Sequence, residues 1–207
     1  MSEQRRPLLI MGSGGLVAEA ADVAEDIGLW DVEGFISPEK IDLDEIGGKP
    51  VYPLSEAIQM AATHHTVCAQ VATNRDRFIE KAIESKFQFC SLVHPSAHVS
   101  RTATIGSGVI IGANAVILSH SRIADHAIIL ANATVSHHAR VGSYSTVAAG
   151  ATLAGLTTIG SNTFVGINAS ILPERHVGNF CFVGAGSVVN KDVPDHRRAV
   201  GNPARIR

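Results

Sequence analysis

Aliphatic residues recur every six positions through the second half of the chain. An α-helix would show a period near 3.6 and a half-buried strand a period of 2, so neither explains this spacing. A period of six predicts a unit made of a short strand and a corner. Three such units form the three sides of one coil of 18 residues. The seventeen consecutive positions are Val93, Val99, Ile105, Ile111, Ile117, Ile123, Ile129, Val135, Val141, Val147, Leu153, Ile159, Val165, Ile171, Val177, Val183 and Val189.

Most residues four positions after each of these aliphatics are small. We interpret the aliphatic as the inward side chain and the small residue as one that fits a tight corner. Together the two registers predict a hexapeptide-repeat parallel β-helix of between five and six coils. Arg175 is the clear exception in the small register, and we expect a local distortion there.

Residues 1–88 lack this rhythm and show strands alternating with helices. Such alternation predicts a small parallel, Rossmann-like α/β domain over 1–88, followed by a β-helix domain with a C-terminal tail over 89–207. Ser55 is a candidate N-cap for the second helix. The expected elements are strands over 7–12, 31–37 and 66–73 and helices over 16–28, 53–61 and 74–86.

A glycine loop made of Gly12, Ser13, Gly14 and Gly15 follows the first expected strand. In a parallel sheet, ligands bind beyond the carboxyl ends of the strands. Backbone amides at the start of a helix suit a phosphate group. The full dinucleotide fingerprint would place a third glycine where Val17 stands, so a tight turn without a ligand remains the alternative.

Composition narrows the classes of function. The net charge of −2 gives no strong attraction to nucleic acid or an anionic membrane, and we expect neither as a partner. No apolar run is long enough to cross a bilayer, and the N-terminus lacks the features of a signal peptide. Three scattered cysteines without a CxxC motif predict neither disulfides nor a cysteine zinc site, so we expect a cytoplasmic protein without a metal.

Two adjacent histidines, His137 and His138, stand out within the repeat. Residues 18 apart should stack in neighbouring coils, about 4.8 Å apart. This arithmetic places Gly155 next to His137, and Leu156 and His120 next to His138. A base beside an accessible backbone N–H is the pairing that acyl transfer needs. A zinc site of the kind found on some β-helices would need further acidic or glutamine side chains, which the region lacks.

Several motifs in this order carry a family resemblance. They are IMGSGG with VEGFIS, LVHPSAHV, VSHHARVG, GATLAG, IGSNTFVGINASILP and VVNKDVPDHRRAVGNPAR. The chain resembles the sialic-acid O-acetyltransferase and nucleotide-amino-sugar N-acetyltransferase group of hexapeptide-repeat acyltransferases, which includes bacillosamine- and perosamine-type enzymes. The resemblance covers nearly the whole chain.

The resemblance implies a left-handed β-helix and a homotrimer with active sites between subunits. It implies that His137 is the general base for direct transfer from acetyl-CoA to the 4-amino group of a nucleotide-linked 4-amino-4,6-dideoxysugar. The acetyl-CoA-binding residues would be Gly155, Ile167 and Ala185. The nucleotide sugar would contact the glycine loop (Gly12, Ser13, Gly14, Gly15) together with Ser37, Thr73 and Asn74.

The chain departs from the family pattern at several places. Leu130 stands where an asparagine is frequent, Leu16 where a histidine commonly follows the double glycine, and Ser37-Pro38-Glu39 where acidic residues often follow the second strand. Another departure is the residue after the base. The family usually has Glu or Asp directly after the base, whereas this chain has His138, which we count with His137 and Gly155 as catalytic. Either His138 orients the base or a carboxylate such as Glu174 does so. Two other functions stay open: O-acetylation of a sugar hydroxyl such as that of sialic acid, and a non-catalytic trimer that binds a nucleotide sugar.

Overall fold

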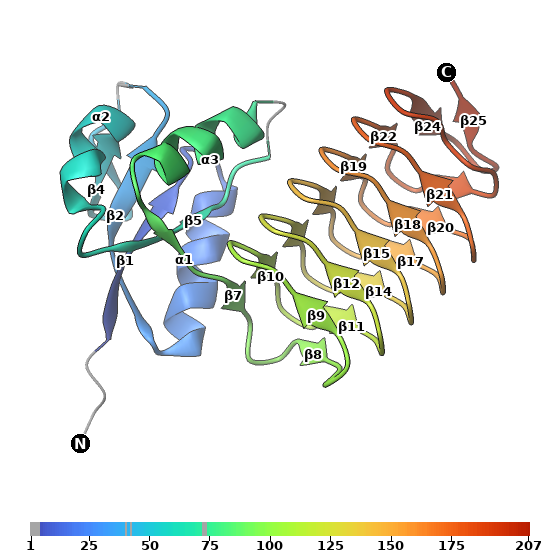
Figure 1. Cartoon of the computed structure of the whole chain (residues 1–207), viewed down its shortest axis with the longest axis horizontal. Coiled ribbons are helices and arrows are strands. Elements are labelled where there is room, and N and C mark those ends of the chain that lie inside the picture. Colours follow the sequence, from blue (N-terminus) through green and yellow to red (C-terminus); the bar gives the residue numbers. More distant parts are fainter. Residues whose placement is uncertain (1–4, 40, 42, 72–73) are drawn as a thin grey trace. The chain divides into compact units, whose positions relative to one another are not determined.

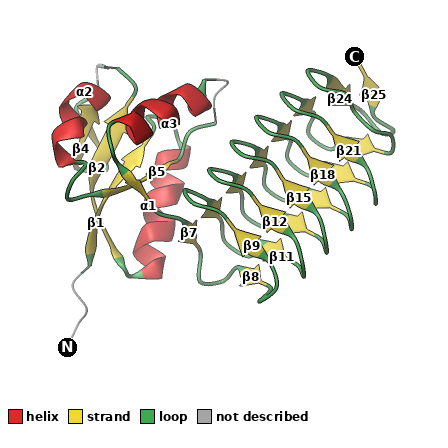
Figure 2. Cartoon of the chain, in the orientation of Figure 1, coloured by secondary structure: helices red, strands yellow, loops and turns green. Residues whose placement is uncertain are grey.

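The structure is a computed structural model that describes residues 5–39, 41, 43–71 and 74–207. The chain divides into two compact units, residues 1–94 and 95–207 (Figure 1). Figure 2 shows helices in the first unit and short strands joined by turns in the second. None of the helices within the described ranges is long and apolar enough to cross a membrane.

The first unit contains a six-stranded sheet. Its order is β3 (Glu45–Ile46), β4 (Lys49–Pro53), β2 (Trp30–Ser37), β1 (Arg6–Met11), β5 (His65–Cys68) and β6 (Gln88–Phe89). All described neighbours are parallel except β3 and β4, which form an antiparallel hairpin. Gly47 and Gly48 make its turn with positive φ values of 57° and 75°. We did not predict this hairpin, although a Gly-Gly pair is a recognised turn signal.

Helices connect the strands of this unit: α1 (Leu16–Ile27), α2 (Leu54–Ala57) with the 3₁₀ turn η1 (Ile58–Met60), and α3 (Arg75–Glu84). α1 ends at Gly28, whose φ of 74° gives a left-handed cap. The N-cap of α2 is Pro53, so the prediction that Ser55 caps this helix is wrong. The strand expected over 66–73 ends at Cys68, and residues 72–73 lie outside the described ranges. β7 (Leu92–Val93) is the last strand of the unit.

The second unit is the predicted β-helix, with three sheets whose strands are mostly two residues long (Figure 1). Their described strand pairs are parallel except for β24 and β25, which pair antiparallel at the C-terminal end. The first sheet holds β8 (His98–Val99), β11 (Val116–Ile117), β14 (Thr134–Val135), β17 (Thr152–Leu153), β20 (Ser170–Ile171) and β23 (Val188–Val189). The second holds β9 (Thr104–Ile105), β12 (Arg122–Ile123), β15 (Arg140–Val141), β18 (Thr158–Ile159) and β21 (His176–Val177). The third holds β10 (Ile110–Ile111), β13 (Ile128–Ile129), β16 (Thr146–Val147), β19 (Phe164–Val165), β22 (Phe182–Val183), β24 (Arg198–Val200) and β25 (Arg205–Ile206).

The repeat sets the register of this unit. Val135 pairs with Ile117 in one coil and with Leu153 in the next, 18 residues away in each direction. These aliphatic side chains point inward and are fully buried, so every coil contributes to one continuous apolar core.

The distortion that we expected at Arg175 is absent. β18 and β21 pair in the regular register on its C-terminal side, and the Arg175 carbonyl accepts a hydrogen bond from the Thr158 N–H at 3.0 Å. The Arg175 side chain lies outside the core: it is partly exposed, and its Nη1 atom is 3.7 Å from Oδ1 of Asp192. The length of the coil changes further along the chain instead. Val177 forms a parallel bridge with Val193, which is 16 residues away rather than 18.

Candidate functional site

The three corners of the β-helix carry different side chains. We call the corner after the first sheet the histidine corner; the tips of its turns are Ser119–His120, His137–His138, Gly155–Leu156 and Pro173–Glu174. We call the corner before that sheet the asparagine corner; its tips include Ala113–Asn114, Ala131–Asn132, Ala149–Gly150, Ile167–Asn168 and Ala185–Gly186. Since every turn has the same backbone path, each column of equivalent residues runs straight up the helix.

The stacking expected from the 18-residue coil is present at the histidine corner. The Leu156 N–H donates to the His137 carbonyl oxygen at 3.0 Å, and the His138 N–H donates to the Ser119 carbonyl oxygen at 2.9 Å. The imidazole of His137 lies over Gly155, where an added Cβ would be 2.5 Å from Cε1 and Nε2 of the ring. Gly155 is buried and its φ is not positive. Glycine is therefore needed here to make room for the imidazole rather than for the backbone conformation.

His138 is in contact with the same ring. The Nδ1 atoms of His137 and His138 are 3.3 Å apart, and the ring planes are nearly perpendicular at 82°. One of these two nitrogens must carry the proton of the hydrogen bond. When His137 donates from Nδ1, its Nε2 keeps a lone pair beside Gly155 and can accept a proton. Both imidazoles are exposed, so a ligand can reach them.

The candidate acetyl-CoA residues lie at two different corners. Ile167 and Ala185 belong to the asparagine corner, whereas Gly155 belongs to the histidine corner. The Gly186 N–H donates to the Ile167 carbonyl oxygen at 2.8 Å, which stacks the two turns. Ile167 is 53% exposed, an unusual state for a large aliphatic side chain in a well-packed repeat. The first sheet separates the two sets within one chain.

In the first unit, three strand ends meet at the glycine loop. The Gly12 N–H donates to the Ile36 carbonyl oxygen at 2.7 Å, and the Ala69 N–H donates to the Met11 carbonyl oxygen at 2.8 Å. Gly12 has a φ of 134°, and a Cβ there would collide with Val17 and with the Ala69 carbonyl. Gly12 is therefore needed for packing the turn.

The other loop residues are more open. Ser13 is exposed, and an added Cβ at Gly14 or Gly15 would meet nothing within 4 Å. These positions leave backbone amides at the start of α1 accessible to an anion.

The other residues predicted to bind the nucleotide sugar differ in how far their side chains are exposed. Ser37 is only 1% exposed, and its hydroxyl donates to the Glu39 carbonyl oxygen at 2.6 Å. Asn74 is exposed at the N-cap position of α3, but its side chain makes no capping hydrogen bond. Thr73 lies outside the described residues. Of the two described residues in this set, Asn74 is the one whose side chain a ligand can reach directly.

Arg75 is a residue of this edge that the sequence analysis missed. It is only 3% exposed, and its Nη1 donates to the Gln70 carbonyl oxygen at 3.3 Å. Burial raises the pKa of the nearby Cys68 thiol to about 11, although the positive charge of Arg75 acts in the opposite direction. The sequence could have pointed to Arg75, because it directly follows the N-cap of a helix at the edge of an α/β sheet where ligands bind.

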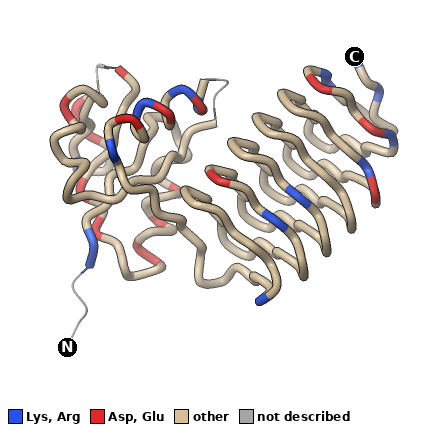
Figure 3. The backbone as a smooth tube through the Cα atoms, viewed as in Figure 1, with Lys and Arg blue, Asp and Glu red and all other residues tan. Residues whose placement is uncertain are grey.

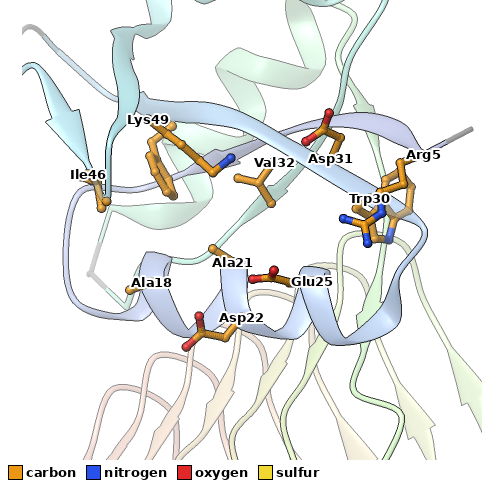
Figure 4. A pocket seen from close by; sticks show the side chains of 12 residues that line it. Arg5, Ala18, Ala21, Asp22, Glu25, Trp30, Asp31, Val32, Ile46 and Lys49 are labelled. Carbon is orange, nitrogen blue, oxygen red and sulfur yellow. The ribbon is translucent and has the colours of Figure 1, made fainter.

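A separate cavity of about 280 Å³ lies in the first unit beside α1 (Figure 4). It combines carboxylates of Asp22 and Glu25 from α1 with the ammonium group of Lys49. None of the predicted ligand-binding residues lines it. It is therefore distinct from the glycine loop.

The cysteines and the possible metal ligands are other functional groups of the chain. Cys68, Cys90 and Cys181 are free thiols. Burial raises the pKa of Cys90 to about 12, so this thiol is a poor nucleophile near neutral pH. In the part of the chain that the structure describes, no group of three or more His, Cys, Asp or Glu side chains could hold a metal ion.

Comparison with known proteins decides the family. PerB from Caulobacter crescentus, solved with CoA and GDP-perosamine, has a TM-score of 0.89 and 30% identity, and the match covers 97% of each chain. The chain belongs to the nucleotide-amino-sugar acetyltransferases. A family model of the GMPPB C-terminal domain also matches residues 87–200 of this chain. A search of curated proteins found no match to the chain.

Of two further structures, the first supports the family and the fold, and the second supports the fold alone. The acetyltransferase domain of PglB from Neisseria gonorrhoeae FA1090, solved with acetyl coenzyme A, has a TM-score of 0.87 and 28% identity over 98% of this chain and 99% of that one. WeeI from Acinetobacter baumannii AYE shares the fold with a TM-score of 0.87 at 22% identity, over 98% of this chain and 100% of that one. The predicted fold class, a Rossmann-like domain followed by a left-handed parallel β-helix, is confirmed.

Proposed function

We propose that this family member is an acetyl-CoA-dependent N-acetyltransferase acting on the 4-amino group of a nucleotide-linked 4-amino-4,6-dideoxysugar. The observation that carries the proposal is the His137 imidazole over Gly155, within a chain that matches PerB along its length. The likeness to the PglB domain with bound acetyl coenzyme A supports the same acyl donor.

In the proposed reaction, the substrate amine attacks the thioester carbonyl carbon of acetyl-CoA. Nε2 of His137 accepts the proton that the amine loses as the C–N bond forms. The C–S bond then breaks, and the CoA thiolate leaves and takes up a proton. No acetyl-enzyme forms in this proposed reaction, because the amine attacks the thioester directly.

His138 takes the place of the family's acidic residue in this proposal. By accepting a hydrogen bond from Nδ1 of His137, it holds the tautomer that leaves Nε2 free. Glu174 lies two coils above His138 in the same column, so His138 is the nearer candidate for this role. Gly155, which lies against the His137 ring, would offer its N–H to the thioester oxygen.

We further propose a homotrimer. Gly155 and the pair Ile167 and Ala185 lie at different corners, so a second subunit is needed to bring them to one acetyl-CoA molecule. The glycine loop, Ser37, Asn74 and the undescribed Thr73 would hold the nucleotide sugar. The free cysteines are compatible with a reducing cytoplasm as the site of the reaction.

Release of CoA thiol from acetyl-CoA tests the proposal, with GDP-, UDP- and dTDP-linked 4-amino-4,6-dideoxysugars as separate acceptors. We expect turnover with one of the three, and mass spectrometry should show the product heavier by one acetyl group on nitrogen. Turnover with sialic acid and none of the amino sugars would contradict N-acetylation and favour O-acetylation. No turnover with any acceptor would favour the non-catalytic trimer.

A further inference from the structure

Two arginines lie side by side on the second sheet of the β-helix. Arg122 on β12 and Arg140 on β15 are direct partners in the register, and both side chains are exposed. Figure 3 shows these two basic segments next to each other. Like charges placed directly opposite in a sheet repel each other and destabilise the pair. Such a pair therefore requires an explanation.

No carboxylate neutralises the two guanidinium groups. Within the described ranges, neither Arg122 nor Arg140 takes part in a salt bridge. The other outward positions of this sheet carry no acid either; they are Thr104, Thr158 and His176. Asp125, three residues after Arg122, uses its Oδ1 to accept the Ser107 N–H at 2.8 Å. Among the described residues, this positive charge therefore has no salt-bridge partner.

The arginines line a pocket that borders the proposed base. This pocket of about 450 Å³ is formed by His120, Arg122, His138, Arg140, Leu156 and Thr158. The rings of His120 and His138 are stacked, with centroids 4.9 Å apart. Because His138 also contacts His137, the pocket begins one side chain away from the proposed reaction centre.

We propose that Arg122 and Arg140 bind the diphosphate of the acceptor nucleotide sugar. Guanidinium groups bind phosphate oxygens with paired, charge-assisted hydrogen bonds. A diphosphate would also neutralise the repulsion between the two arginines. His120 and Thr158 add a ring N–H and a hydroxyl group to the same pocket.

Both substrates contain a diphosphate, so the distance from the reacting atom decides between them. In the acceptor, a single sugar ring separates the amine from the diphosphate. In acetyl-CoA, the whole pantetheine arm separates the thioester from the diphosphate. A phosphate pocket that borders the base therefore fits the acceptor. This inference rests on the proposed function and adds Arg122 and Arg140 to its substrate-binding residues.

The test compares steady-state kinetics of R122Q, R140Q and the double variant with the intact enzyme. Losing a hydrogen bond to a charged group costs about 10- to 150-fold in affinity. We expect each single variant to raise the KM of the acceptor by about tenfold or more. The double variant should raise it by about 100-fold, with the KM of acetyl-CoA changed less than about threefold. R140K, which keeps the charge without the planar fork, should fall between R140Q and the intact enzyme.

A matched control removes one positive charge elsewhere. Lys81 is exposed on α3 in the first unit, and K81Q should leave both KM values unchanged. A rise in the KM of acetyl-CoA alone would overturn the inference and assign the pocket to CoA phosphates. Unchanged KM values together with loss of assembly in sedimentation experiments would also overturn it, because the arginines would then face a neighbouring subunit.

Equilibrium binding separates failure of this inference from failure of the proposed function. Calorimetry with GDP, UDP, dTDP and inorganic pyrophosphate needs no turnover. Weaker binding of these probes to the double variant than to the intact protein would support the pocket even if no acceptor were acetylated. Equal binding to both proteins would overturn the pocket even if the intact enzyme acetylated an amino sugar.

Discussion

The histidine corner and the asparagine corner share one backbone conformation but hold very different side chains. The second tip residue of each described turn has a positive φ, between 54° and 68°. At the asparagine corner this position is Asn114, Asn132, Gly150, Asn168 or Gly186, all of them residues that tolerate the left-handed region. At the histidine corner it is His120, His138, Leu156 or Glu174.

This difference teaches which corner is shaped by the fold alone. A left-handed conformation costs roughly 1–2 kcal/mol for a side chain such as leucine, and asparagine reduces that cost. The asparagine corner therefore follows the conformational preference of its turns. The histidine corner gives up some of that stability, as the third corner does at Tyr144 and Phe180. The predictions below test this contrast.

The largest effect is expected at His137. Replacing it with alanine should lower kcat by two or more orders of magnitude, because a positioned base contributes about 10²–10⁴-fold. His138→Ala should cost less, since His138 orients the base in the proposed mechanism and does not itself take the proton. The control at the asparagine corner, Asn132→Ala, should leave kcat unchanged. If His138→Ala were the more damaging variant in steady-state assays, His137 would not be the base.

A smaller effect is expected at Gly155. Its methyl group in Gly155→Ala would occupy the space of the His137 ring, so kcat should fall by about tenfold or more. The equivalent tip position at the other corner already holds Ala131 and Ala149, which indicates that the turn itself accepts alanine. In an enzyme that already carries His137→Ala, the same change should add little loss. A full additional loss would show that Gly155 acts independently of the ring.

The smallest effect is on stability and comes from exchanging residue types between the corners. Leu156→Asn should stabilise the fold by about 0.5–1 kcal/mol, because asparagine relieves the left-handed strain at a half-exposed side chain. Asn132→Leu should destabilise it by about the same amount. Thermal unfolding at one fixed protein concentration measures both as shifts of Tm. A lower Tm for Leu156→Asn would refute the contrast between the corners.

Much of the β-helix was predictable because residues 18 positions apart in the sequence lie next to each other in neighbouring coils. The pairs His137 with Gly155 and His138 with His120 follow from an 18-residue coil, and the structure contains both. The same arithmetic pairs Arg122 with Arg140, a signal that the sequence analysis overlooked. Ser55 failed as an N-cap because α2 already begins at Leu54, with Pro53 as its N-cap, so Ser55 lies inside the helix.

By itself, the sequence determined the β-helix, its register and which residues share a column, since a backbone of fixed period leaves little freedom. Only the tertiary structure decided how side chains use that scaffold. It placed the His137 imidazole over Gly155 with Nδ1 toward His138, and it engaged the Ser37 hydroxyl in its own turn. It also buried Arg75 at the start of α3. Side-chain rotamers and burial depend on neighbours from distant parts of the chain, and a local sequence pattern does not specify those neighbours.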